Sequence, residues 1–153
     1  MIEIGEVRFY RLLGAPLETA LPRLLEKLHE RGLKALVRLP DAQSLEAMDR
    51  ALWTFDPASF LPHGTTDGPE PERQPICLTT GDRCPNGADA LVLVNGVAAP
   101  EPLGAFRLCL YMFDGNDEAA LARARTDWLV YKARAGRVGY WAQREDGGWA
   151  QKA

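Results

Sequence analysis

Five side chains of types that commonly bind metals are scattered through the chain: Cys77, Cys84, Cys109, His29 and His63. No two of them have the C-x-x-C or H-x-x-x-H spacing that brings ligands to one ion. Cys77 and Cys109 lie in apolar segments, where cysteine is ordinarily a small core residue. We therefore expect no metal site. An odd number of irregularly spaced cysteines also indicates reduced thiols in a cytoplasmic protein.

Catalytic and phosphate-binding patterns are equally weak. Ser59, His63 and Asp67 could supply a nucleophile, a base and an acid, but the serine is not in a G-x-S-x-G turn. His63 is better explained as a loop histidine bonded to the backbone. The first predicted strand is followed by "LLGAPLET", which contains neither G-x-G-x-x-G nor a P-loop. We expect no catalytic residue and no cofactor, although a nucleotide- or small-molecule-binding enzyme remains the alternative.

A basic amphipathic helix is the more informative feature. Residues 121–137 contain five basic side chains and one acid, so this segment carries +4 in a chain whose net charge is −3. Arg125, Leu129 and Lys132 recur at i, i+4 and i+7, which places two cations around one apolar residue. A solvated helix face would also explain this pattern. The sharper interpretation is a docking site for a short acidic peptide that carries an apolar side chain.

The second unusual feature is an aromatic loop, "RALWTFDPASFLPHGT", at residues 50–65. Trp53, Phe55 and Phe60 follow a helical run that we expect to end at Leu52, among proline, aspartate and glycine residues typical of turns. Either these rings fill the end of the core, or they present an apolar patch to a partner.

The elements that position these features alternate between strand and helix. Residues 6–14 and 137–145 predict a first strand and a last strand at a sheet edge, and short apolar runs predict buried strands at residues 33–39, 75–80, 88–96 and 106–113. The leucines within residues 17–28 recur at helical spacing and predict a helix that ends at Gly32. Thr19 is its expected N-cap, because Pro22 would then lie in the first turn, where proline is tolerated.

Two further helices complete the expected fold. One is capped by Asp41 or Ser44, and the other covers residues 117–135 and packs on the sheet through a stripe that includes Trp128. This order predicts one three-layer α/β domain over residues 1–153, with a mostly parallel sheet and helices on both faces.

Composition agrees with that interpretation. The chain has 153 residues, 46% of them hydrophobic and 25% charged, which suits one globular domain with a sizeable core. Neither its charge nor its apolar runs favour a nucleic-acid-binding surface or a membrane-spanning segment. We expect a monomer that does not bind nucleic acid directly in a sequence-specific way and does not contact a membrane.

The segment "ALWTFDPASFLPHG" resembles a signature of the chi subunit of bacterial DNA polymerase III holoenzyme, whose members read close to A-L-W-x-x-x-x-x-S-F-[LV]-P-H. The resemblance extends to the opening "VRFYRL", to "PICLTTGDRCPNGADALVLVNG" and to "VGYWAQ" after the last helix. It implies a mononucleotide-binding-like fold without a known nucleotide. It also implies a non-catalytic accessory protein that links the clamp loader to the C-terminal tail of single-stranded-DNA-binding protein, which is acidic and ends in phenylalanine.

The same resemblance implies two interfaces. The partner surface for the psi subunit, another clamp-loader component or a helicase-type protein would contain Trp53 and Phe60, with neighbours Leu52, Phe55, Pro62 and His63. The tail site would contain Arg125, Trp128, Leu129 and Lys132. The family usually has lysine or arginine where this chain has Leu129, so either Lys132 replaces that charge or the helix is locally offset.

Overall fold

The computed structural model describes residues 4–56, 58, 60–98 and 106–153. It contains one eight-stranded sheet with strand order β3-β4-β2-β5-β6-β1-β7-β8. All neighbouring strands are parallel except the β7–β8 pair, which is antiparallel. The strands are β1 (Ile4–Leu12), β2 (Ala35–Arg38), β3 (Gly64–Thr65), β4 (Ile76–Thr79), β5 (Ala90–Val94), β6 (Leu108–Asp114), β7 (Ala135–Gln143) and β8 (Trp149–Gln151).

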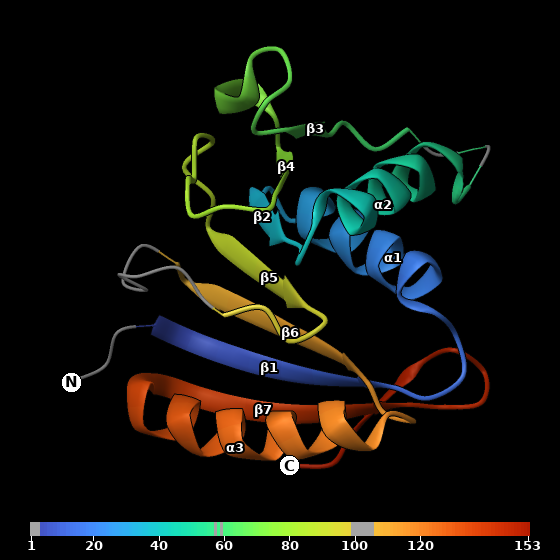
Figure 1. Cartoon of the computed structure of the whole chain (residues 1–153), viewed down its shortest axis with the longest axis vertical. Coiled ribbons are helices and arrows are strands. Elements are labelled where there is room, and N and C mark those ends of the chain that lie inside the picture. The colour runs from blue at the N-terminus through green and yellow to red at the C-terminus, as the bar shows by residue number, and fades with distance from the viewer. Residues whose placement is uncertain (1–3, 57, 59, 99–105) are drawn as a thin grey trace.

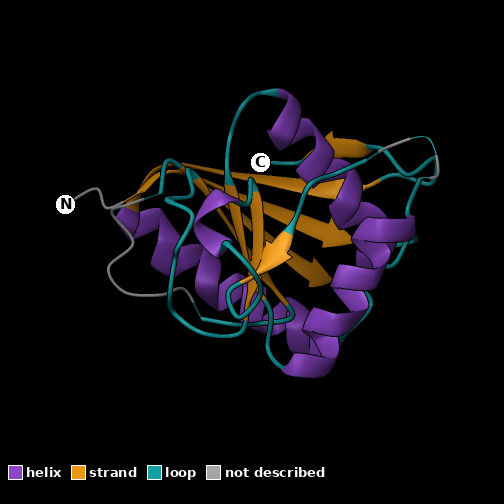
Figure 2. Ribbon diagram, turned by 90° about the horizontal axis from the view of Figure 1, so that it is seen from above, coloured by secondary structure: helices purple, strands orange, loops and turns teal. Residues whose placement is uncertain are grey.

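Helices cover both faces of this sheet, as Figures 1 and 2 show. Helices α1 (Leu17–Glu30) and α2 (Ala42–Thr54) pack on one face, and α3 (Glu118–Arg134) packs on the other; a 3₁₀ turn, η1 (Pro71–Arg73), precedes β4. The predicted three-layer α/β architecture is therefore confirmed. No described helix is both long enough and apolar enough to cross a membrane.

The central strands are buried on both sides because their apolar runs are continuous. Every residue of β4 and β5 is buried. In register, Leu36 lies beside Leu91, and Leu91 beside Cys109. These three side chains belong to the core on the α3 side of the sheet. The next residue along each strand faces α1 and α2, as the two-residue strand period requires.

The helix ends follow local capping chemistry. Asp41 caps α2 by accepting a hydrogen bond from Ser44 N at 2.7 Å, so the aspartate rather than the serine is the cap. Asp117 caps α3 by accepting from Ala119 N and Ala120 N. The predicted Thr19 cap is wrong: α1 begins at Leu17 with Pro16 as its N-cap, and Pro22 lies inside the helix.

Two other expectations need correction. Strand β7 is not an edge strand, because the short strand β8 folds back on it through a turn in which Arg144 N donates to Gly148 O. Helix α2 continues to Thr54, so Trp53 projects from a helix rather than from a loop. This places the tryptophan in the last turn of a helix.

Candidate protein-binding sites

The edge where parallel α/β sheets usually bind ligands is occupied here by a side chain of the protein itself. The amide groups of Leu13, Gly14 and Ala15, in the loop between β1 and α1, donate to Gln143 Oε1 at 3.1, 3.0 and 3.0 Å. Gln143 is buried at the end of β7. Backbone amides in this loop commonly bind phosphate. In this protein a glutamine oxygen takes the place of that anion.

The remaining groups with chemical potential are separated. Burial raises the pKa of the Cys109 thiol to about 12 and is the largest cause of the rise for Cys77, to about 11. His63 Nδ1 donates to Leu61 O at 2.9 Å, which confirms a backbone-bonded histidine, and Ser59 lies outside the described residues. Within residues 4–56, 58, 60–98 and 106–153, no three His, Cys, Asp or Glu side chains are grouped as metal ligands would be.

The first exposed apolar surface is the aromatic patch, which we define as Trp53 and Phe60 with His63 behind them. Trp53 is 56% exposed and Phe60 is 72% exposed, and their ring centroids lie 6.0 Å apart. The His63 ring is 4.6 Å from Trp53, and its Nε2 lies 3.0 Å from Asp49 Oδ1 without hydrogen-bond geometry. The histidine therefore supports the tryptophan from inside.

The four weaker candidates, Leu52, Phe55, Pro62 and His63, are all less exposed than Trp53 and Phe60. Leu52, on α2, is buried in the core that α1 and α2 form with the sheet, and Phe55 is half-buried against that same core. Pro62 is also half-buried. Thus Trp53 and Phe60 project outward, whereas Leu52, Phe55 and His63 position the chain that carries them.

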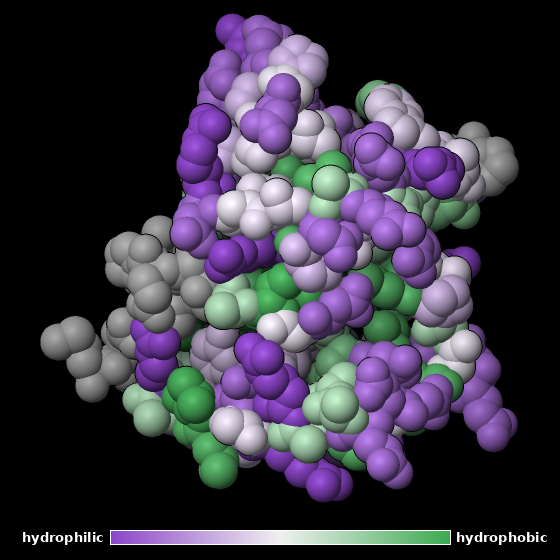
Figure 3. All heavy atoms as spheres, viewed as in Figure 1, coloured by the Kyte–Doolittle hydropathy of each residue, from purple (hydrophilic) through white to green (hydrophobic). Residues whose placement is uncertain are grey.

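The second surface is a pocket of about 350 Å³ beside α3, which we call the α3 pocket. Strand β1 and its two neighbours β6 and β7 form its floor, and α3 forms its wall. Its lining consists of Phe9, Arg11, Phe113, Leu121, Ala124, Arg125, Trp128, Leu129 and Tyr140. Figure 3 shows apolar green atoms among polar purple ones over the C-terminal part of α3.

Three of the four predicted tail-binding residues line this pocket directly. The Trp128 ring packs edge-on against Phe9 and Tyr140, with centroid distances of 5.4 and 6.1 Å. Leu129 is 71% exposed at the rim, and Arg125 is also exposed. Lys132 lies outside the lining, but its Nζ is 5.5 Å from the Trp128 ring centroid, within cation–π range.

Sequence reasoning missed Arg11, which enters the α3 pocket from strand β1. Its Nη2 donates to Gly115 O at 3.1 Å, and its Nε is buried and has no hydrogen-bond partner in the described part of the chain. Strand periodicity contained a signal: Val7 and Phe9 are core residues on the α3 side, and Arg11 is the next residue on that side. A cation at the end of an otherwise apolar strand face is unusual enough to indicate a site.

The aromatic patch and the α3 pocket lie on different sides of the sheet, since α2 covers one face and α3 the other (Figure 1). Neither resembles a catalytic cleft: one is a pair of exposed rings, and the other is an apolar pocket bordered by cations. The fold and these surfaces define an α/β domain with two exposed apolar surfaces, a feature that in other proteins often marks a binding site.

Comparison with known proteins gives the family. The profile of the family described as "DNA polymerase III chi subunit, HolC" matches residues 4–138, and the chain belongs to this family. A protein named "Probable DNA polymerase III subunit chi" from Rickettsia prowazekii (strain Madrid E) is 34% identical over 76 residues, which is 50% of this chain and 46% of that protein. The aligned part thus spans about half the length of this curated relative. The family is a replisome accessory family of DNA polymerase III.

Proposed function

We propose that this protein is a non-catalytic replisome adaptor with two protein-binding surfaces. Its aromatic patch binds the psi subunit, another clamp-loader component or a helicase-type protein. Its α3 pocket binds the acidic C-terminal tail of single-stranded-DNA-binding protein. The adaptor acts in the cytoplasm and contacts DNA only through that second partner.

The observation that carries the proposal is the chemistry of the α3 pocket. Among the residues that the structure describes, its lining is apolar and aromatic except for two arginines and includes no acidic side chain. Such a pocket suits a ligand that combines an apolar side chain with negative charge. Arg125 at the rim and Lys132 beside Trp128 are placed to attract the terminal carboxylate and the acidic residues that precede it.

The aromatic patch supports the other half of the proposal. Large aromatic rings that are exposed on a free monomer dominate many protein interfaces, because they bury much apolar area with little loss of side-chain freedom. Trp53 is anchored on α2 and supported by His63, so the ring is held in place before a partner arrives. Phe60 extends the same surface.

A titration with a fluorescent peptide tests the tail site. The peptide contains several aspartates and ends in phenylalanine with a free carboxylate. We expect a dissociation constant on the order of micromolar, because such a short ligand buries few residues. Arg125→Ala and Lys132→Ala should each weaken binding several-fold, whereas Arg23→Ala, which removes an exposed cation from α1 on the other face, should not.

Unchanged binding in both α3 variants would remove this helix as the tail site. A thermal-shift screen with nucleotides and the same peptide addresses the alternative, because only a ligand of the native state raises the melting temperature. Stabilisation by a nucleotide and not by the peptide would favour a nucleotide-binding enzyme instead.

A further inference from the structure

A second hollow lies on the other face of the sheet from the α3 pocket, and we call it the α1 groove. It consists of two adjoining cavities of about 720 Å³ and about 190 Å³. Helix α1 forms one wall and the β7–β8 hairpin the other, and β1 and β6 form the floor of the smaller cavity. Leu24, Lys27 and Trp149 line both cavities, so the two are continuous.

The smaller cavity of the α1 groove has an aromatic lining. It contains Tyr10, Trp141 and Trp149, and the Trp149 ring lies edge-on to Tyr10 with the ring centroids 5.0 Å apart. Tyr10 is buried, whereas both tryptophans are half-buried and retain contact with solvent. Aromatic rings at a cavity surface are a stacking platform for a nucleobase, since every base has a planar π face.

Helix α1 presents a row of three cations to this groove. Arg23, Lys27 and Arg31 recur every four residues, so neighbouring members lie about 6 Å apart along the helix axis. All three are exposed, and none has an ion pair or a side-chain hydrogen bond with another residue in the described ranges of the chain. A row of unpaired cations on the wall of a cavity suits a ligand that carries several negative charges close together.

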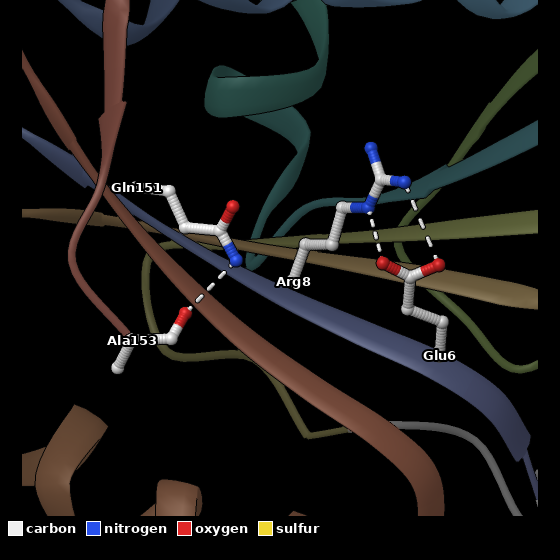
Figure 4. A network of polar contacts seen from close by, with 4 residues as sticks. All are labelled: Glu6, Arg8, Gln151 and Ala153. Carbon is white, nitrogen blue, oxygen red and sulfur yellow. Dashed lines mark hydrogen bonds and ion pairs between the residues drawn. The ribbon is translucent and has the colours of Figure 1, made fainter.

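The other charged groups that line the α1 groove already have partners. Arg8 donates from Nε to Glu6 Oε2 at 2.7 Å (Figure 4). Arg144 Nε lies 3.4 Å from Asp146 Oδ1, and Glu26, the second acid of the lining, is not free either. Among the described residues, the unpartnered charge of the groove is therefore positive.

We propose that the α1 groove binds a nucleoside polyphosphate, with the base against Trp149 in the smaller cavity and the phosphates beside Arg23 and Lys27 in the larger one. Lys27 lines both cavities and so stands where the two halves of such a ligand meet. Together the cavities fall within the range of about 300–1,000 Å³ that is usual for small-molecule sites. This site does not use the loop amides after β1, which Gln143 Oε1 already occupies.

An acidic peptide matches the α1 groove less well than a nucleotide does. It spreads its carboxylates along the chain, with about 3.3–3.6 Å for each extended residue. A diphosphate or triphosphate instead concentrates several charges in one group, which two neighbouring cations on α1 can hold together. The joining of an aromatic cavity to a cationic one also follows the division of a nucleotide into base and phosphates.

The test uses the full chain and calorimetric titration at low salt with ATP, GTP, adenosine and inorganic triphosphate. We expect ATP or GTP to bind with a dissociation constant on the order of 10–100 μM. Adenosine and triphosphate should each bind about tenfold more weakly or worse, because each lacks one half of the contacts. Lys27→Gln should weaken nucleotide binding about fivefold or more, whereas the matched control Lys34→Gln, at an exposed lysine outside the groove, should not. Both variants should melt like the wild type, since both lysines are exposed.

The indole N–H signals of the tryptophans locate the nucleotide in an NMR spectrum of the wild type. ATP or GTP should shift the Trp149 signal and leave the signal of Trp128, in the α3 pocket, in place. A Trp149 signal that ignores both nucleotides would overturn the proposal, and so would triphosphate that binds as tightly as ATP. Binding of a single-stranded oligonucleotide while both nucleotides fail would overturn it in favour of a nucleic-acid groove. The tail peptide is followed through Trp128, so each of these failures leaves the proposed tail site intact.

Discussion

Truncation of Phe60 separates a binding role from a folding role. Phe60 is 72% exposed, so about a quarter of its surface is covered in the free protein. A fully buried phenylalanine hides roughly 200 Å², so Phe60 covers about 50 Å². At ~25 cal/mol per Å², its removal should cost at most about 1.3 kcal/mol of folding stability, equivalent to a fall of roughly 3–5 °C in a chain of this size. The same truncation at the centre of an interface can remove about 2 kcal/mol or more of binding free energy.

The assay compares Phe60→Ala with Phe9→Ala, an identical truncation at a ring that is 0% exposed. Phe9→Ala should lose about 3–5 kcal/mol of stability, as core truncations do. Phe60→Ala should melt close to the wild type but fail to capture clamp-loader subunits from an extract of the source cell. It should still bind the tail peptide with wild-type affinity. Melting losses of similar size in both variants would show that Phe60 is a core residue and refute the aromatic-patch interpretation.

Three further predictions concern the buried glutamine at the end of β7, the buried thiol and the helix cations. Gln143→Leu should lower the free energy of unfolding in urea by about 2–4 kcal/mol, because three amides lose their acceptor, whereas exposed Gln151→Leu should change it by less than about 0.5 kcal/mol. Burial raises the pKa of the Cys109 thiol from 9.0 to about 12, so the unfolded chain loses this proton first, and stability should fall as pH rises from about 9 towards 12. Cys109→Ala should show a smaller fall in melting temperature over that range. Tail-peptide binding should weaken with added salt, and by less in an Arg125→Ala, Lys132→Ala double variant, because exposed charges are screened.

Features set by short-range pattern were predictable from the sequence. The continuous apolar runs predicted β4, β5 and β6, because strands buried on both faces have no polar alternation to display. The stripe through Ala124, Trp128 and Tyr131 predicted which side of α3 packs on the sheet. Since that side is buried, the same helical period also identified Arg125 and Leu129 as exposed.

Contacts between distant parts of the chain were not predictable in this way. Gln143 meets the loop at Leu13–Ala15 only after β7 has paired with β1, and no local pattern marks a glutamine as the acceptor for that loop. Arg11 enters the α3 pocket because β1 lies between β6 and β7. This strand order determines which residues surround Arg11, and local sequence patterns do not reveal it. Strand β8 did leave a signal, since Asp146 and Gly147 form a turn before Trp149, but the strand is too short to show alternation.

The tryptophan side chains offer the most direct test of the claim that the tail binds the α3 pocket and leaves the aromatic patch free. The chain has four tryptophans, and each gives one indole N–H signal in a two-dimensional NMR spectrum, assignable by single substitution. Addition of the acidic peptide with its free C-terminal phenylalanine should shift the Trp128 signal progressively and leave the Trp53 signal unmoved. A shift of the Trp53 signal with the Trp128 signal unchanged would place the tail on the aromatic patch instead of the α3 pocket. No shift of either signal would contradict tail binding by this protein.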